Sequence, residues 1–407
     1  MLPENRVVIT ALGVLAPNGI GTEAFWASIL ERRSGIGPIT LFDASDLPCR
    51  IAGEVKDFFP LKYIDPILRP ERRMGRAAQL GLAAAQMALK DSGLTPALMS
   101  RAGEIPVIMG VSSSALELRE KPPASWIPVA SIPHIIGSLI SHAMGVQTRI
   151  LTVSTGCASG LDAAGLAADE IRRGKADIAI AGAADSVMSR FVFECFCRAN
   201  KLSKRNDDPS RASRPFDRDR DGGVAAEGAG VVIMESLRFA AERGAVPLAE
   251  VMGYGMSADL FKVPEGNGLE RSMRLALANS SLRPAQIDHI SAHGPSDPHM
   301  DQIETELIRK VFGPAANRIP VSSIKGVTGN PMGVGCMHQI IAAALTFRDG
   351  IIPPTANWDN RDPECDLDYV AEGPRAAVIT SLLINTHGFG RGNSSLVLQR
   401  APADGKR

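Results

Sequence analysis

Cys157 stands where a run of β-branched residues gives way to a helix-forming run. The Ser-Thr-Gly before it favours a turn, and the alanine-rich residues after it begin an apolar helix. A cysteine at a helix N-terminus faces the positive end of the helix dipole, which favours the nucleophilic thiolate over the thiol. Its small neighbours would let an extended substrate approach closely. The alternative is a structural cysteine, since cysteine is among the residues most often buried.

His293 ends a stretch, 287–292, that has the pattern of a strand, and the Gly-Pro after it breaks that strand. Active sites of open α/β sheets are built where strands end. A histidine in this position could act as a general base or donate a hydrogen bond to a developing oxyanion. The alternative is a histidine in a surface loop.

The loop after His293 also offers a metal site as a second interpretation. Its candidate ligands are His293, Asp297, His299 and Asp301. Pro295 and Pro298 interrupt the helical spacing that usually assembles such ligands. Asp297 equally well predicts the cap of a helix over 301–311. We therefore expect no metal here.

Two glycine-rich loops nearer the C-terminus carry further polar groups. The first contains Lys325, Thr328 and Asn330. An asparagine amide can donate to a carbonyl oxygen, but it does not exchange protons at neutral pH. The second loop, 387–393, follows the last long apolar strand, and its backbone N–H groups could form an oxyanion hole. Its glycine spacing is not that of a dinucleotide-binding loop.

An α/β scaffold must position these groups, because short β-branched runs alternate with longer alanine- and leucine-rich runs. Strands are predicted at 7–10, 105–109, 150–153, 178–181, 230–234, 321–323 and 378–384. Helices are predicted at 75–91, 158–173, 270–278, 301–311 and 337–348. This alternation predicts largely parallel sheets.

Two segments of the chain, 155–174 and 328–350, resemble each other. In each, a glycine-rich turn opens an apolar helix that ends in arginine and glycine. Because both helices are apolar nearly all round, both should be buried between layers. Two such halves predict a five-layered α-β-α-β-α arrangement, with a boundary at 238–246.

Composition excludes several classes of protein. The chain has 407 residues, and because 45% of them are hydrophobic it is not a disordered protein. Its 44 basic residues are balanced by 44 acidic ones, so it is not a generally basic nucleic-acid binder. The charge-free stretch 122–148 contains prolines, so it predicts a tunnel-lining or interface segment (126–144) rather than a membrane span. Six cysteines without disulfide spacing and no signal-like start favour the cytoplasm. The charged run 198–221 predicts a solvated surface loop.

Taken together, the motifs resemble those of the β-ketoacyl-acyl-carrier-protein synthases of the thiolase-like superfamily, on the branch that elongates fatty acids and polyketides. The resemblance runs nearly end to end. Its landmarks are VVITALG at 7–13, RIAGEV at 50–55, GCASG at 156–160, RPFDRDRDG at 214–222, EGAG at 227–230, PPTAN at 353–357 and NSSLV at 393–397.

The resemblance implies a duplicated thiolase fold with halves at 1–242 and 243–407, normally dimeric, and no cofactor beyond the phosphopantetheine of an acyl carrier protein that brings the substrates. Cys157 would accept the acyl group, while His293 and Asn330 would stabilise the enolate formed when malonyl-carrier protein loses CO2. Lys325, with Glu304 as its partner, would hold the histidine region. The remaining implied roles are an oxyanion hole and gate at Cys157, Gly388, Phe389 and Gly390, substrate contacts at Thr328 and Arg391, and carrier docking at Arg69, Arg72 and Arg73.

Several residues depart from the family pattern. Asn330 stands where this branch usually has histidine, and Pro295 and Asp297 replace two threonines that contact phosphopantetheine. Asp297 would place a negative charge near a malonyl carboxylate unless Arg391 or Lys325 offsets it. His387, Arg391, Gly223 and Ala226 also differ from the family, which suggests an unusual acyl partner.

The leading functional hypothesis is decarboxylative Claisen condensation in a specialised fatty acid or polyketide pathway. The first alternative is an acyltransferase that passes the acyl group from Cys157 to a hydroxyl or amine. The second is a non-condensing subunit that partners a related ketosynthase. The expected partners are an acyl carrier protein and a second subunit, identical or related, with no nucleic acid and no membrane.

Overall fold

A computed structural model describes residues 6–113, 115–260, 267–388 and 390–401, apart from the side chains of residues 71 and 72. One mixed sheet of eleven strands dominates the described part. Its strands are β1 (Val7–Ala16), β2 (Gly19–Ile20), β5 (Ile105–Gly110), β6 (Thr148–Val153), β7 (Ile178–Asp185), β8 (Gly228–Ser236), β9 (Ala249–Ala258), β10 (His289–Ser291), β11 (Val321–Ser322), β14 (Ser381–His387) and β15 (Gly392–Arg400). Two small ladders are formed by β3 (Ile36–Pro38) with β4 (Ile51–Gly53) and by β12 (Ile351–Ile352) with β13 (Arg375–Ala376).

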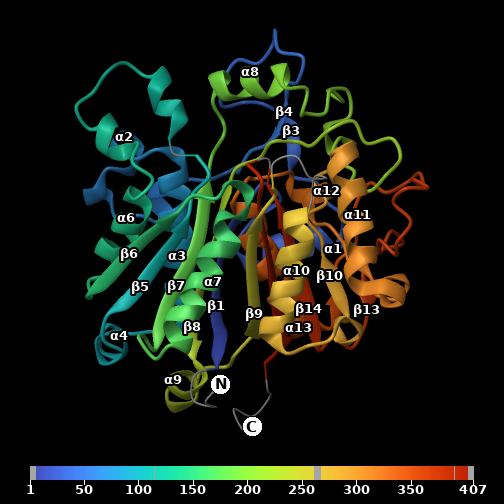
Figure 1. Ribbon diagram of the computed structural model, residues 1–407. Helices are drawn as coiled ribbons and strands as arrows, with labels where there is room; N and C mark the ends of the chain where they lie inside the picture. Colours follow the sequence, from blue (N-terminus) through green and yellow to red (C-terminus); the bar gives the residue numbers. More distant parts are fainter. Residues whose placement is uncertain (1–5, 114, 261–266, 389, 402–407) are drawn as a thin grey trace.

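The helices surround this sheet (Figure 1). They are α1 (Thr22–Leu30), α2 (Pro70–Arg73), α3 (Arg76–Ser92), α4 (Pro96–Arg101), α5 (Ile127–Ala130), α6 (Ile135–Met144), α7 (Ser159–Arg172), α8 (Arg190–Arg198), α9 (Leu237–Glu242), α10 (Asn267–Ser280), α11 (Pro298–Phe312), α12 (Lys325–Thr328) and α13 (Val334–Asp349). The five helices predicted from the sequence correspond to α3, α7, α10, α11 and α13, with bounds shifted by a few residues.

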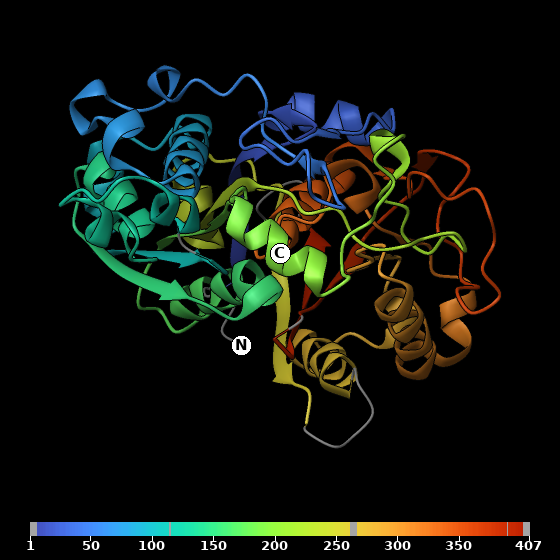
Figure 2. The same cartoon turned by 90° about the horizontal axis from the view of Figure 1, so that it is seen from above.

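The order of the strands repeats on the two sides of the sheet. From the centre outward it reads β1-β8-β7-β5-β6 on one side and β9-β15-β14-β10-β11 on the other. The two series meet where β1 pairs with β9, with Val7 opposite Val251. Seen from above, the cyan segments lie on one side and the orange and red segments on the other, while the yellow-green loop after α8 extends over the orange and red side (Figure 2).

The prediction of largely parallel sheets is wrong, because the sheet is mixed. β5 runs parallel to β6 and β7, and β10 runs parallel to β11 and β14. β8 and β15 run antiparallel to both of their neighbours. Parallel neighbours need a crossover connection, whereas β15 follows β14 within a few residues and pairs with it antiparallel.

One helix layer lies between the two halves of the sheet and one lies outside each half, which gives the expected five-layered arrangement. Small side chains let α7 and α13 lie in the middle, where they share one apolar core with β7 and β8 on one side and β9, β14 and β15 on the other. Every residue of α13 from Val334 to Phe347 is buried, as its all-round apolar sequence predicts. The outer helices α3 and α10 cover the opposite faces of the two half-sheets.

The prediction of a solvated loop at 198–221 is wrong in its second half. Arg214, Asp217 and Arg220 are buried. The Arg220 guanidinium lies 2.5 Å from the carboxylate of Asp362, and the Asp217 carboxylate accepts backbone N–H bonds from residues 359 and 360. The charges are buried because they are paired, a condition that a linear charge count does not reveal.

The apolar stretch 122–148 forms α5 and α6. None of the helices in the described ranges combines the length and the apolarity needed to cross a lipid bilayer. α6 buries Ile136 and Ile140 in the core beneath α3. Its expected role in lining a tunnel stays a prediction.

Candidate active site

The turn that carries Cys157 ends β6 and opens α7. Gly156 adopts a φ of +65°, a conformation that costs glycine little, and a single 3-10 turn (Gly156–Ala158) leads into the helix. Ser159 fixes this turn, since its hydroxyl accepts a hydrogen bond from the backbone N–H of Thr155 and donates one to the carbonyl of Gly156. Cys157 is only 2% exposed. The predicted placement of this cysteine at the N-terminal end of a buried helix is confirmed.

Asp185 supports the same turn from behind, and the sequence analysis did not single it out. One of its carboxylate oxygens accepts from the backbone N–H of Ser112 at 2.9 Å, and the other accepts from Gly333 at 3.0 Å. The hydroxyl of Ser112 in turn donates to the carbonyl of Gly156 at 2.7 Å. Burial raises the pKa of Asp185 to about 7, although its amide donors oppose that shift. The only signal in the sequence was an acidic residue at the end of an apolar strand.

A buried polar cluster formed by His293, Glu304 and Lys325 comes from the other half of the chain. The Lys325 ammonium donates to the backbone carbonyl of His293 at 2.5 Å. The Glu304 carboxylate accepts the backbone N–H groups of His293 and Gly294, each at 2.8 Å. All three side chains are at most 2% exposed. The structure thus brings together the residues that the sequence analysis grouped around the histidine.

Burial shifts the pKa of each member of this cluster, and the neighbouring charges act differently on each one. Burial lowers the pKa of Lys325, and the nearby Glu304 opposes that shift. Burial raises the pKa of Glu304, while the N–H groups and Lys325 oppose that shift. The pKa of His293 lies well below 6.5, chiefly because the ring is buried and further because Lys325 and His387 are close. This direction of the shift favours the neutral imidazole at neutral pH.

A neutral His293 gives a test in the pH profile. At saturating substrate, we expect the rate of the step that depends on His293 to change less than about twofold between pH 8 and pH 6, because its ring does not take up a proton in that interval. The measurement is the initial rate of product formation across this range. A fall that titrates with a pKa near 6.5 would contradict the neutral imidazole.

The glycine-rich loop after β14 lies against the cysteine turn. A Cβ atom added to Gly388 would lie 3.4 Å from the backbone nitrogen of Cys157. Gly390 is exposed, and the expected gating residue Phe389 lies outside the described residues. The Arg391 side chain is exposed and donates to the carbonyl of Leu260. The Thr328 hydroxyl is buried and bonded to the carbonyl of Gly329. The substrate contacts expected of Thr328 and Arg391 stay predictions.

His387 is a second buried histidine near this loop, noted in the sequence only as a departure from the family. Its ring nitrogen Nε2 lies 3.3 Å from the carboxylate of Asp259. Asp259 also accepts from the side chain of Asn393 and from the backbone N–H of Gly268. Through Asp259, His387 and Asn393 at the two ends of the loop are connected to the end of β9 and the start of α10.

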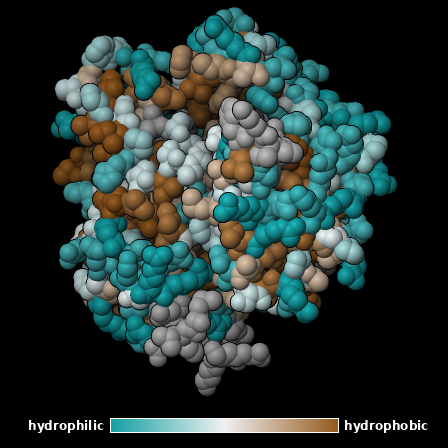
Figure 3. Space-filling view, viewed as in Figure 1, coloured by the Kyte–Doolittle hydropathy of each residue, from teal (hydrophilic) through white to brown (hydrophobic). Residues whose placement is uncertain are grey.

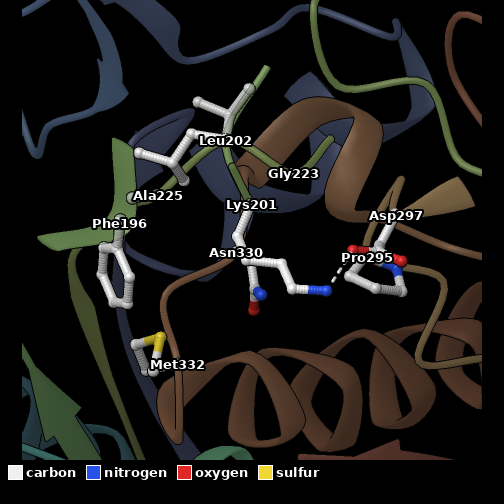
Figure 4. A pocket seen from close by; sticks show the side chains of 10 residues that line it. Phe196, Lys201, Leu202, Gly223, Ala225, Pro295, Asp297, Asn330 and Met332 are labelled. Carbon is white, nitrogen blue, oxygen red and sulfur yellow. Dashed lines mark ion pairs between the residues drawn. The ribbon is translucent and has the colours of Figure 1, made fainter. Parts of the chain in front are cut away.

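A small pocket opens beside Asn330. It is lined by Phe196, Lys201, Leu202, Gly223, Val224, Ala225, Pro295, Asp297, Asn330 and Met332 (Figure 4). The backbone of Asn330 is fixed by hydrogen bonds to Val224 and Ala226. Its side-chain oxygen is buried and has no hydrogen-bond partner among the described residues. A substrate group that donates a hydrogen bond would satisfy it.

The second interpretation of the 293–301 loop, a metal site, finds no geometric support. Among the described residues, no three metal-ligating side chains converge. Asp297 instead caps α11, since its carboxylate accepts the backbone N–H groups of His299 and Met300 at 3.0 Å. Asp301 is buried, accepts from the backbone N–H of Phe216, and has its pKa raised by burial to about 8.

The expected docking arginines lie on the segment around α2. Arg69 and Arg73 are exposed, whereas the side chain of Arg72 lies outside the described part of the chain. Docking of an acyl carrier protein at these arginines stays a prediction.

The fold and the site together define an α/β protein built of two similar halves. One half carries a cysteine at the start of a central helix, and the other carries a buried lysine–glutamate–histidine cluster whose Lys325 feels the charge of that cysteine. The chain belongs to the β-ketoacyl synthase family. Residues 4–240 match the family's "Beta-ketoacyl synthase, N-terminal domain" and residues 248–359 match its "Beta-ketoacyl synthase, C-terminal domain".

Relatives of this family are similar over nearly the whole chain. The "3-oxoacyl-[acyl-carrier-protein] synthase 2" of Synechocystis sp. is 37% identical, over 98% of this chain and 99% of its own. The "Tetracenomycin polyketide synthase ketoacyl synthase alpha subunit" of Streptomyces glaucescens is 38% identical, over 98% and 97%. The solved structure "The ishigamide ketosynthase/chain length factor" superimposes with a TM-score of 0.89 at 34% identity, covering 98% of this chain and 99% of that one.

Proposed function

We propose that the protein is a ketosynthase that condenses an acyl group on Cys157 with a malonyl group on an acyl carrier protein. The observation that carries this proposal is the position of Cys157, at the buried N-terminus of α7 and against Gly388. Family membership supports the same reaction. The pathway is a specialised fatty acid or polyketide pathway, as the names of the relatives suggest.

The reaction proceeds in three balanced steps. The Cys157 thiolate attacks the acyl thioester and releases the carrier's thiol. The malonyl thioester then loses CO2, and its C2 carbanion, stabilised as an enolate, attacks the acyl-cysteine carbonyl. The tetrahedral intermediate collapses, the thiolate of Cys157 leaves, and a β-ketoacyl-carrier thioester is released.

The side chains have distinct roles in this proposal. Neutral His293 and the Asn330 amide donate hydrogen bonds to the enolate oxygen, and Lys325 and Glu304 position the histidine backbone. The backbone N–H groups of Cys157 and Phe389 form the oxyanion hole, with Gly388 and Gly390 as the pliant parts of the gate. The substrates arrive on phosphopantetheine, so the enzyme needs no resident cofactor.

The protein forms a dimer, either with a second copy of the same chain or with a related subunit. An acidic carrier protein docks at Arg69 and Arg73. The protein works in the cytoplasm. Each chain consists of the two halves 1–242 and 243–407. Exposed apolar side chains support a subunit interface at the β6 edge of the sheet, since Leu151 on β6 is 46% exposed and Val129 on α5 is 57% exposed. Figure 3 shows apolar residues gathered on the side of the molecule that carries β5 and β6.

The direct test supplies an acyl-carrier protein and labelled malonyl-carrier protein, then follows CO2 release and the intact mass of the protein. Acylation of Cys157 together with CO2 release supports the ketosynthase. Acylation without CO2 indicates an acyltransferase with another acceptor. Neither product indicates a non-condensing subunit, which must then be tested with its partner.

Asn330→Ala separates the two half-reactions. We expect acylation of Cys157 to stay within about twofold and CO2 release to fall about 10- to 100-fold, because one hydrogen bond to developing charge is lost. The readouts are intact mass and labelled CO2. Asn330→His keeps a donor and should retain most of the CO2 release. Equal loss of both half-reactions would contradict the assigned role.

A further inference from the structure

An ion pair crosses the pocket beside Asn330. The Lys201 ammonium lies 3.6 Å from the carboxylate of Asp297, and Figure 4 shows the lysine side chain extending past Asn330 toward that carboxylate. The Lys201 side chain is 43% exposed, whereas that of Asp297 is 8% exposed. Lys201 and Asp297 are the charged members of the ten residues that line this pocket. The other lining residues are apolar apart from Asn330.

Asp297 is fixed as the negative wall of the pocket. Its other carboxylate oxygen accepts two backbone N–H bonds at the start of α11, so the side chain cannot swing away without uncapping that helix. An anionic substrate in the pocket beside Asn330 therefore meets a buried carboxylate. Like charges repel strongly in such a poorly solvated place.

Lys325 or Arg391 was expected to offset this charge, and the structure places both elsewhere. The Lys325 ammonium donates to the carbonyl of His293, and the Arg391 guanidinium donates to the carbonyl of Leu260. The cation beside Asp297 is Lys201, on the segment that follows α8. A lysine in a charged loop gave no signal in the sequence that it would face the residue 96 positions further on.

We propose that Lys201 determines specificity for the anionic extender: its ammonium, held by Asp297, cancels the repulsion of that carboxylate and admits the malonyl group. This inference rests on the proposed condensation. The neutral acyl group that loads Cys157 carries no carboxylate and does not need this compensation. Two observations locate the ammonium at the entrance rather than at the reacting atoms, namely the half-exposed lysine and the buried Asn330.

The position at the entrance also suits the chemistry. A cation bonded to the malonyl carboxylate throughout the reaction would stabilise the ground state and oppose the loss of CO2. Because the Asp297 carboxylate competes for the Lys201 ammonium, Lys201 can lower the electrostatic barrier to entry of the malonyl group without binding the malonyl carboxylate tightly. The charges of Lys201 and Asp297 cancel, so the pocket has no net charge, yet an incoming malonyl group meets the more exposed Lys201 ammonium before the buried Asp297 carboxylate.

The test compares two carrier-bound groups that differ in charge but hardly in shape, malonyl and acetoacetyl. Their dissociation constants are measured on the full-length Cys157→Ala protein, in which no acyl-enzyme can form. Lys201→Met should weaken binding of malonyl-carrier about tenfold and change binding of acetoacetyl-carrier less than twofold. The difference should shrink at high salt.

Removing the opposing charge should cancel the defect. In the double variant Lys201→Met with Asp297→Asn, malonyl-carrier should bind within about threefold of the parent protein, since no carboxylate is left to compensate. Lys204→Met, at an exposed lysine three residues on, is the matched control and should change neither constant. Equal weakening of both carriers, or additive effects in the double variant, would overturn the proposal.

These outcomes are separate from those that test the proposed function. Absence of CO2 from the unmodified protein refutes the condensation, whatever the binding constants are. An unchanged preference for malonyl over acetoacetyl in Lys201→Met refutes the role of Lys201, even if CO2 is released at the full rate.

Discussion

Cys157→Ala should abolish acylation and reduce condensation by at least about 10³-fold, because the substitution removes the only atom of the proposed site that can form a thioester with the acyl group. The fold should be unaffected, since the side chain is small and the turn is held by backbone bonds and by Ser159. Intact mass after incubation with an acyl-carrier protein gives the result directly. The parent protein gains one acyl group, and the variant gains none.

Two other cysteines supply matched controls. Cys195 is exposed on α8, so Cys195→Ala should acylate at the parent rate. Cys336 is buried, and its thiol donates to the backbone carbonyl of Cys157 at 3.4 Å. Burial raises the pKa of Cys336 to about 12, which keeps it a thiol and a poor nucleophile. An acyl adduct that persists in Cys157→Ala would assign the nucleophile to another residue.

Glu304→Ala should destabilise the protein by about 3–5 kcal/mol, because it removes one partner of a buried charged cluster. Two backbone N–H groups, those of His293 and Gly294, lose their acceptor, and the ammonium of Lys325 loses the charge that opposes the cost of its burial. The loop that carries His293 should shift, so condensation should fall as well. Chemical unfolding monitored by circular dichroism measures the free energy, and CO2 release measures the reaction.

Glu306 provides the control on the same helix. It is exposed two residues further along α11, so Glu306→Ala should change the free energy of unfolding by less than about 0.5 kcal/mol. Glu304→Gln keeps the shape and one oxygen acceptor, and it should recover part of the lost stability. If Glu304→Ala unfolds with the same free energy as Glu306→Ala, then the buried cluster does not stabilise the protein.

The central helices show how far local pattern predicts this fold. Their runs of alanine and other small apolar residues predicted burial on all sides. α13 is buried in that way, whereas the last turn of α7 keeps Asp169, Glu170 and Arg172 partly exposed. The direction of the strands did not follow from the same pattern. A β-branched run such as that of β8 is equally suited to parallel and antiparallel pairing, and the path of the chain between strands decided which one formed.

The candidate site divides in the same manner. The sequence singled out Cys157, His293, Lys325 and Asn330 because each lies at a turn where a strand gives way to a helix or loop. It gave no warning of Asp185 behind the cysteine turn or of Asp259 bound to His387, since each is an ordinary polar residue whose partner lies far along the chain. The burial of Arg214 and Arg220 was missed because each also depends on a carboxylate more than 140 residues away, Asp359 for Arg214 and Asp362 for Arg220.

The sequence by itself determined the α/β class, the repeat of a glycine-rich turn with an apolar helix, and the start of a helix just after Cys157, because periodicity and turn residues act over a few neighbouring positions. The tertiary structure alone decided which charges are buried together. Only folding places Lys201 beside Asp297, the amides of α11 on that carboxylate, and Lys325 on the carbonyl of His293. Electrostatic compensation depends on distance in space and on exclusion of water, and neither quantity is written in the order of residues.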